Sequence, residues 1–190
     1  MSEIMQSTVL MVPGLRGDMP DHWQTILQGE LPKALCTPRI GTQNLSCAAW
    51  VQSLDDTLAG IAGPVTLVAH SAGVMMVAHW AQSHRRPIRG ALLAAPPDFE
   101  QPMPAPYPPI EALRANGWLP TPSSKLPFPS IVAASSNDPL GSITRAKEMA
   151  TNWGSRFVDI GPAGHLNPVA GYGPWPRAHD LLRELEALAG

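Results

Sequence analysis

The stretch LVAHSAGVMM, residues 67–76, interrupts an apolar run with only two polar side chains, His70 and Ser71, before it becomes apolar again. A strand that ended at the surface would be followed by turn residues and a polar loop. Here the apolar pattern resumes at once, with helical character from Ala72 onward. The stretch therefore predicts a buried strand that turns sharply at Ser71 and passes directly into a helix.

The rest of the chain alternates short apolar runs with amphipathic segments. Strands are expected at residues 8–12, 35–40, 65–69, 90–95, 130–135 and 156–160, and helices at 21–31, 47–61, 72–82, 142–153 and 176–188. Asp18 or Asp21 is expected to cap the first helix. This alternation predicts a compact α/β fold, with a mostly parallel sheet covered by helices on both faces. A length of 190 residues predicts a single domain over residues 1–190.

One segment breaks the alternation. Residues 96–129 hold half of the chain's 22 prolines, at positions 96, 97, 102, 104, 106, 108, 109, 120, 122, 127 and 129. Because proline fixes φ and lowers the entropy lost on ordering, we expect a stiff surface crossover, with one short helix at residues 110–116. The segment leaves the carboxyl end of the strand at 90–95. We therefore expect it, rather than a helical lid, to form one wall of any pocket there.

Composition narrows the classes of function. The net charge is −2 without a basic cluster, which predicts neither a nucleic-acid partner nor binding to an anionic membrane. Cys36 and Cys47 form neither a CxxC pair nor a disulfide framework, as expected of thiols in a reducing compartment. The first twelve residues lack the marks of a signal peptide, which predicts a cytoplasmic protein. No metal or organic cofactor is expected, because neither zinc-ligand spacing nor a dinucleotide fingerprint is present.

Ser71 is the candidate nucleophile. Parallel sheets bind ligands at the carboxyl ends of their strands, and Ser71 follows such an end and precedes a helix. A strand–serine–helix turn projects the hydroxyl from the sheet, provided that the residues two before and two after are small, as Ala69 and Gly73 are. The competing interpretation is a serine that only caps the helix. The strand before it and the helix after it favour catalysis.

A candidate base and acid follow in the order that this kind of fold requires, serine, then Asp or Glu, then His. His165 lies in GPAGHLNP, after the last expected strand and before the final helix. Asp98 and Asp138 both follow strands and precede His165, so spacing alone leaves both open as the acid. Asp138 is favoured because its turn, SSNDPL, joins a strand directly to a helix.

Two backbone N–H groups are candidates for an oxyanion hole. One belongs to Ala72, directly after the nucleophile, where a helix N-terminus presents free N–H groups. The other is expected from the loop VPGLRGD after the first strand. Pro13 has no N–H and Gly14 permits a tight turn, so Leu15 is the natural donor.

Four stretches carry a resemblance to a known family: MVPGLRGDMPDHWQ, LVAHSAGV, LPFPSIVAASSNDPLGSITRAKEMATNWGS and DIGPAGHLNPVAGYGPWP. Together they resemble the small α/β-hydrolases of the retinoblastoma-binding-protein-like and YdeN-type serine hydrolases, from Val9 to about Leu182. The resemblance implies a fold without a large helical lid and a triad of Ser71, Asp138 and His165. One departure is Ala69, where the family usually has glycine.

The quoted stretches also contain candidates for the substrate pocket, and the triad suggests a reaction. His22, Trp23 and Arg16 are candidates for the pocket, although Trp23 is expected to pack the first helix onto the sheet. His22 either reaches the mouth of the pocket or satisfies a loop carbonyl. We expect hydrolysis of a small-molecule acyl substrate of ester type through an acyl-enzyme. The alternatives are an amidase or aminopeptidase with the same triad, and a protein-interaction module with a vestigial site and an unknown partner.

Overall fold

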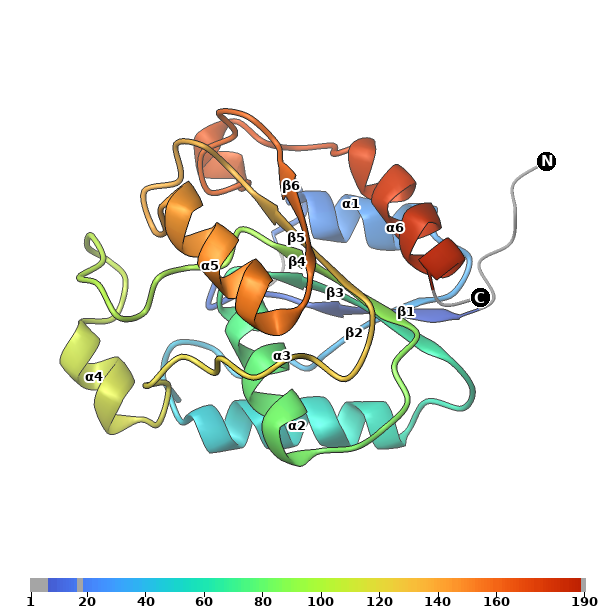
Figure 1. The fold of residues 1–190 in the computed structure, drawn as a ribbon, viewed down its shortest axis with the longest axis horizontal. Helices are drawn as coiled ribbons and strands as arrows, with labels where there is room; N and C mark the ends of the chain where they lie inside the picture. The colour runs from blue at the N-terminus through green and yellow to red at the C-terminus, as the bar shows by residue number, and fades with distance from the viewer. Residues whose placement is uncertain (1–6, 17–18, 189–190) are drawn as a thin grey trace.

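The computed structural model describes residues 7–16 and 19–188 (Figure 1). The strands in this part of the chain are β1 (Thr8–Val12), β2 (Ala34–Cys36), β3 (Val65–His70), β4 (Gly90–Ala94), β5 (Ser130–Ala134) and β6 (Arg156–Asp159). The helices are α1 (Trp23–Glu30), α2 (Cys47–Ala59), α3 (Ala72–Ser83), α4 (Ile110–Ala115), α5 (Ile143–Trp153) and α6 (Arg177–Leu188), with a 3-10 turn η1 (Pro168–Ala170).

The strands form one sheet in the order β2-β1-β3-β4-β5-β6, and every pairing is parallel. The chain runs from β1 outward to β2 and then returns past β1 to β3. The connections that follow β1 and β3 therefore leave in opposite directions, which opens a crevice beyond their carboxyl ends. The pairing of Val12 with Ala69 brings those two ends level, so Gly14 and Ser71 lie at the same edge of the sheet.

Helices cover both faces of the sheet, as the alternating pattern predicts (Figure 1). On one face, α2, α3 and α5 pack against inward side chains such as Leu10, Leu67 and Val132. On the other face, α1 and α6 pack against Val68, Ile131 and their neighbours. No helix in the described residues is long and apolar enough to cross a membrane.

Most expected elements are found within a residue or two of their predicted ends. The strand expected at residues 35–40 is wrong in extent, because β2 ends at Cys36. The Thr37 N–H still donates to the carbonyl of Met11 at 3.0 Å, but Pro38 has no N–H to continue the ladder. The helix expected from residue 21 begins at Trp23, and its cap is His22, whose Nδ1 accepts the backbone N–H of Gln24 at 3.2 Å. Asp21 is therefore not the cap, and Asp18 lies outside the described residues.

Gly73 fixes how closely α3 approaches the sheet. A Cβ at this position would lie 2.1 Å from the carbonyl oxygen of Val12 and 2.8 Å from that of Pro13, both of them backbone atoms that cannot rotate away. The turn after β1 therefore runs against the first turn of α3. Glycine at this position follows from sterics, as the sequence pattern predicts.

We expect Gly73→Ala to lower the free energy of unfolding by about 2–4 kcal/mol, because the added methyl group overlaps backbone atoms. Gly29→Ala is the matched control. Gly29 lies in α1, and a Cβ added there would meet no atom within 4 Å, so that exchange should raise the same quantity by up to about 1 kcal/mol. Urea unfolding measures both values, and equal stability of the two variants would contradict the steric argument.

Candidate active site

Ser71 lies on a strained turn at the end of β3. Its backbone has φ 55° and ψ −125°, a region that non-glycine residues rarely occupy and that costs about 1–3 kcal/mol. The Ser71 N–H donates to the carbonyl of Ala94 at 3.0 Å, which ties the turn to β4. The side chain makes no capping bond to α3. The helix-cap interpretation of this serine is therefore wrong.

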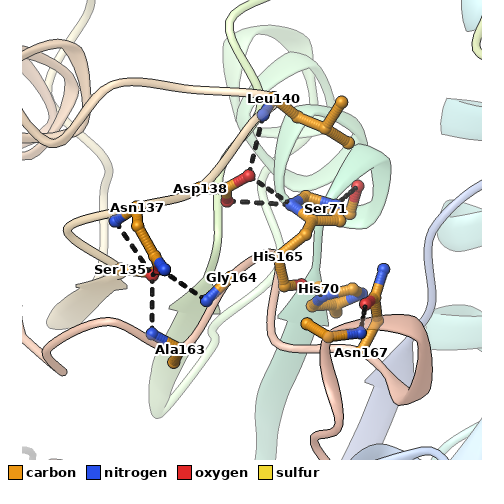
Figure 2. A network of polar contacts seen from close by, with 11 residues as sticks. His70, Ser71, Ser135, Asn137, Asp138, Leu140, Ala163, Gly164, His165 and Asn167 are labelled. Atoms are coloured by element: carbon orange, nitrogen blue, oxygen red, sulfur yellow. Dashed lines mark hydrogen bonds and ion pairs between the residues drawn. The ribbon is translucent and has the colours of Figure 1, made fainter. Parts of the chain in front are cut away.

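The Ser71 hydroxyl instead lies 2.7 Å from Nε2 of His165. On the other side of the imidazole, Nδ1 of His165 lies 2.8 Å and 3.0 Å from the two carboxylate oxygens of Asp138. The Asp138 carboxylate also accepts the backbone N–H of Leu140 at 2.8 Å. The side chains of His165 and Asp138 are 4% and 3% exposed, so this pair is shielded from solvent. Figure 2 shows the continuous chain from Ser71 through His165 to Asp138.

Asp98, the other acid that spacing left open, has different partners. Its carboxylate lies 3.6 Å from Nε of Arg145 and accepts the backbone N–H of Glu100 at 3.1 Å. Its own N–H donates to the carbonyl of Leu140 at 2.8 Å. The structure thus brings Asp138, and not Asp98, into contact with His165.

Side chains after β5 hold the loop that carries His165. The Ser135 hydroxyl accepts the N–H of Ala163 at 3.0 Å, and the Asn137 side-chain oxygen accepts the N–H of Gly164 at 2.7 Å (Figure 2). The hydroxyl of Ser135 also donates to Asn137 at 2.9 Å. The turn that presents Asp138 is therefore bonded to the turn that presents His165.

The residues expected to donate to an oxyanion, Leu15 and Ala72, lie next to the turn at Ser71. A Cβ at Gly14 would be 3.0 Å from the Ser71 Cβ and 3.5 Å from the Ala72 nitrogen, so the loop after β1 packs directly on the turn at Ser71. Leu15 lines the cleft, and Ala72 is buried at the start of α3. In the described part of the chain, no hydrogen bond occupies the N–H of either residue.

Two further histidines form a wall behind Ser71. Nε2 of His70 donates to the carbonyl of His165 at 2.9 Å, and the rings of His70 and His22 are 4.7 Å apart. Burial lowers the pKa of His70 well below its usual value, and nearby His165 and His22 lower it further. Burial, and then repulsion from His165, lower the pKa of His22 to about 4. Both rings are therefore neutral at pH 7.

These lowered pKa values predict an acid-sensitive fold. Between pH 6.5 and about 4, the unfolded chain protonates His22 while the folded chain does not, so the unfolded state binds more protons and stability falls as pH falls. The loss from His22 alone is of order 3 kcal/mol. Urea unfolding of wild type and His22→Asn across this window tests it, since asparagine keeps a helix cap but does not titrate. Parallel stability curves for the two proteins would refute the prediction.

A small cleft that opens to solvent lies over Ser71. Its lining comprises Gly14, Leu15, Arg16, Met19, His22, Gln24, His70, Ser71, Tyr107, His165, Asn167, Pro168 and Val169. Of the three pocket candidates, His22 and Arg16 border this cleft. Trp23 does not line it, because its indole is 1% exposed and packs edge-on against Trp175 behind the cleft.

The proline-rich crossover reaches the cleft through one side chain, Tyr107, whose ring lies 6.4 Å from that of His165. The crossover thus contributes to one wall. The helix within it, α4, contributes nothing to the lining.

Comparison with known proteins identifies the family. A family profile for serine hydrolases matches residues 9–184. The chain belongs to the serine hydrolase family.

Solved structures place this serine hydrolase among α/β-hydrolases. A YdeN-like hydrolase from Pectobacterium atrosepticum is 31% identical, with a TM-score of 0.83 over 98% of this chain and 95% of that one. The ydeN gene product of B. subtilis is 17% identical, with a TM-score of 0.76 over 95% and 99% of the two chains. An esterase domain of a Rhodothermus marinus protein is 14% identical, with a TM-score of 0.62 over 96% and 85%, and shares the fold. A search of curated proteins found no match.

Several residues around the hydrolase site carry no sequence signal of their role. His70 precedes the nucleophile in a strand, where an inward histidine resembles any other core polar residue. Tyr107 and Asn167 lie in loops whose path only the folded chain defines.

Across the described residues of this serine hydrolase, no group of three or more His, Cys, Asp or Glu side chains could hold a metal ion.

Proposed function

We propose that this serine hydrolase cleaves small ester-type substrates by transferring the acyl group to Ser71 and then to water. The observation that carries the proposal is the hydrogen-bonded chain Ser71–His165–Asp138, at the crevice between the ends of β1 and β3. A serine hydroxyl 2.7 Å from an imidazole nitrogen is within reach for direct proton transfer.

In the first half-reaction, Nε2 of His165 takes the Ser71 proton as the hydroxyl oxygen attacks the substrate carbonyl. Asp138 accepts a hydrogen bond from Nδ1–H, which keeps Nε2 free as the base and stabilises the imidazolium. The protonated His165 then returns the proton to the departing alcohol. An acyl-enzyme ester on Ser71 remains.

In the second half-reaction, His165 takes a proton from water, which attacks the acyl-enzyme. Collapse releases the acid and restores the Ser71 hydroxyl. The developing oxyanion of both steps is held by the free N–H groups of Leu15 and Ala72, which bracket the nucleophile. Gly14 supports this role because its lack of a side chain lets the loop after β1 approach the turn.

Ester and amide substrates would use the same groups, and a matched pair of substrates separates them. We expect an anilide of a short acyl group to be cleaved at least about 10² times more slowly than the 4-nitrophenyl ester of the same acyl group, because aniline is a much poorer leaving group than 4-nitrophenolate. The measurement is kcat/KM for each substrate at pH 7.5. If kcat/KM is comparable for the ester and the anilide, the protein is an amidase and the esterase proposal is wrong.

A further inference from the structure

The cleft over Ser71 contains one fully charged side chain on its surface. Of the described residues that line it, Arg16 alone is a Lys, Arg, Asp or Glu. His22 and His70 contribute neutral rings, because burial lowers the pKa of both. The Asp138 carboxylate lies behind His165 with its side chain 3% exposed, and it does not line the cleft. As far as the structure describes it, the wall that a substrate meets therefore carries one guanidinium and no carboxylate.

Arg16 is also held in place beside the reacting groups. Its guanidinium carbon lies 5.2 Å from the centre of the Tyr107 ring, and that ring meets His165 edge-on at 6.4 Å. The backbone carbonyl of Arg16 accepts a hydrogen bond from the guanidinium of Arg39 at 3.1 Å, which adds a second cation nearby. Contact with an aromatic face restrains a guanidinium while its N–H edge stays free for a partner.

Within residues 7–16 and 19–188, the N–H groups of Arg16 have no anionic partner. Among the described residues, no carboxylate forms an ion pair with Arg16. Some other arginines are paired: Arg89 with Glu186, and Arg145 with three acids within reach. Arg16 is an exposed side chain at the border of the cleft, so its charge reaches both the cleft and solvent. A cation beside a low-dielectric wall attracts anions toward that wall.

We propose that Arg16 binds a carboxylate of the substrate, so that the preferred substrates are esters that carry a negative charge close to the scissile bond. The proposal rests on the esterase function above and specifies its substrate class. A planar guanidinium can hold a carboxylate through two parallel hydrogen bonds. The carboxylate can belong to the acyl part or to the alcohol part, since both extend into the same cleft.

Two matched pairs of esters test the proposal and separate these sources. The first pair is the 4-nitrophenyl monoester of glutaric acid and the same compound with its free carboxylate capped as a methyl ester. The second pair is 4-acetoxybenzoate and methyl 4-acetoxybenzoate. Each pair differs by one charge, on the acyl side in the first and on the alcohol side in the second. The rate found with Ser71→Ala is subtracted to remove spontaneous hydrolysis.

The measured quantity is the ratio of kcat/KM for the charged ester to that for its capped partner. Comparing this ratio between proteins cancels the intrinsic reactivity of the esters. In at least one pair, we expect Arg16→Gln to lower the ratio about tenfold, and Arg16→Lys to lower it less because the charge remains. Arg183→Gln is the control, because Arg183 is an exposed arginine on α6 that does not line the cleft. It should keep the wild-type ratio within about twofold.

The pair whose ratio falls identifies the part of the substrate that carries the carboxylate. If wild type and Arg16→Gln show the same ratio in both pairs, the role of Arg16 is refuted and the esterase function stands. If Arg183→Gln lowers the ratio as much as Arg16→Gln, net charge rather than this contact is responsible, and the proposal also fails. If wild type hydrolyses none of the four esters, the proposed function fails together with this inference.

Discussion

Replacing Ser71 with alanine is expected to abolish labelling by a fluorophosphonate and to lower kcat for a 4-nitrophenyl ester by at least about 10⁴-fold. In the proposed mechanism, the Ser71 oxygen, 2.7 Å from Nε2 of His165, is the atom that forms the covalent bond. A fluorophosphonate reacts with a serine only when a base activates it and an oxyanion hole binds the phosphoryl oxygen. Labelling therefore reports on the whole site and needs no knowledge of the substrate.

Ser83→Ala is the matched control for this experiment. Ser83 is an exposed serine at the end of α3, away from the carboxyl edge of the sheet, and its removal should leave labelling unchanged. Circular dichroism and thermal unfolding establish that the Ser71 variant is folded. Labelling that persists in Ser71→Ala would remove this serine from the mechanism. A folded wild-type protein that takes up no label would favour the protein-interaction module.

The second large effect is expected at the carboxylate that contacts His165. Asp138→Asn should lower kcat at least about 10²-fold. The amide NH₂ of asparagine, directed at Nδ1 of His165, favours the tautomer that carries its proton on Nε2. A protonated Nε2 cannot accept the Ser71 proton. In the Ser-His-Asp triad of a serine protease, replacing the aspartate with asparagine lowers kcat by about 10⁴-fold. This factor is equivalent to roughly 5–6 kcal/mol of transition-state stabilisation. Steady-state kinetics with a short-chain 4-nitrophenyl ester give the value.

Asp98→Asn removes the same charge from a similar position in the sequence and is expected to lower kcat less than about tenfold. Asp98 contacts Arg145 and the backbone of Glu100, so its loss affects the crossover and not the imidazole. Both variants need wild-type melting temperatures for the comparison to hold. Greater damage from Asp98→Asn at equal stability would show that the acid has been assigned wrongly.

The sequence predicts the sheet and the turn at Ser71 because both rest on local patterns. Apolar runs such as residues 65–69 are buried on both faces, and the small residue at position 73 is required by backbone contact that any close strand–helix turn creates. His165 is predicted from chain order alone. The choice of Asp138 over Asp98 needs the resemblance as well, since both acids follow strands and only the fold brings one of them to the imidazole.

The features that sequence patterns miss depend on contacts between distant segments. The bond from His70 to the carbonyl of His165 spans 95 residues, and nothing in the sequence around either residue marks it. His22 caps α1 in place of the expected aspartate, because a histidine ring nitrogen can also accept the orphan N–H at a helix start. The resemblance groups Trp23 with the pocket beside His22, yet adjacent residues at a helix start point in different directions.

The crossover of residues 96–129 supplies Tyr107 to the cleft and no member of the Ser71–His165–Asp138 chain. One wall of the cleft and the residues of the proposed chemistry therefore come from different stretches of the sequence, whereas Arg16 belongs to the same loop as Leu15. Substitutions at Tyr107 are expected to reshape this wall. The start of the crossover is less tolerant, because the Asp98 N–H bonds the carbonyl of Leu140 beside the Asp138 turn. An engineer who wishes to change selectivity can therefore vary position 107 first and leave the Ser71–His165–Asp138 chain as it is.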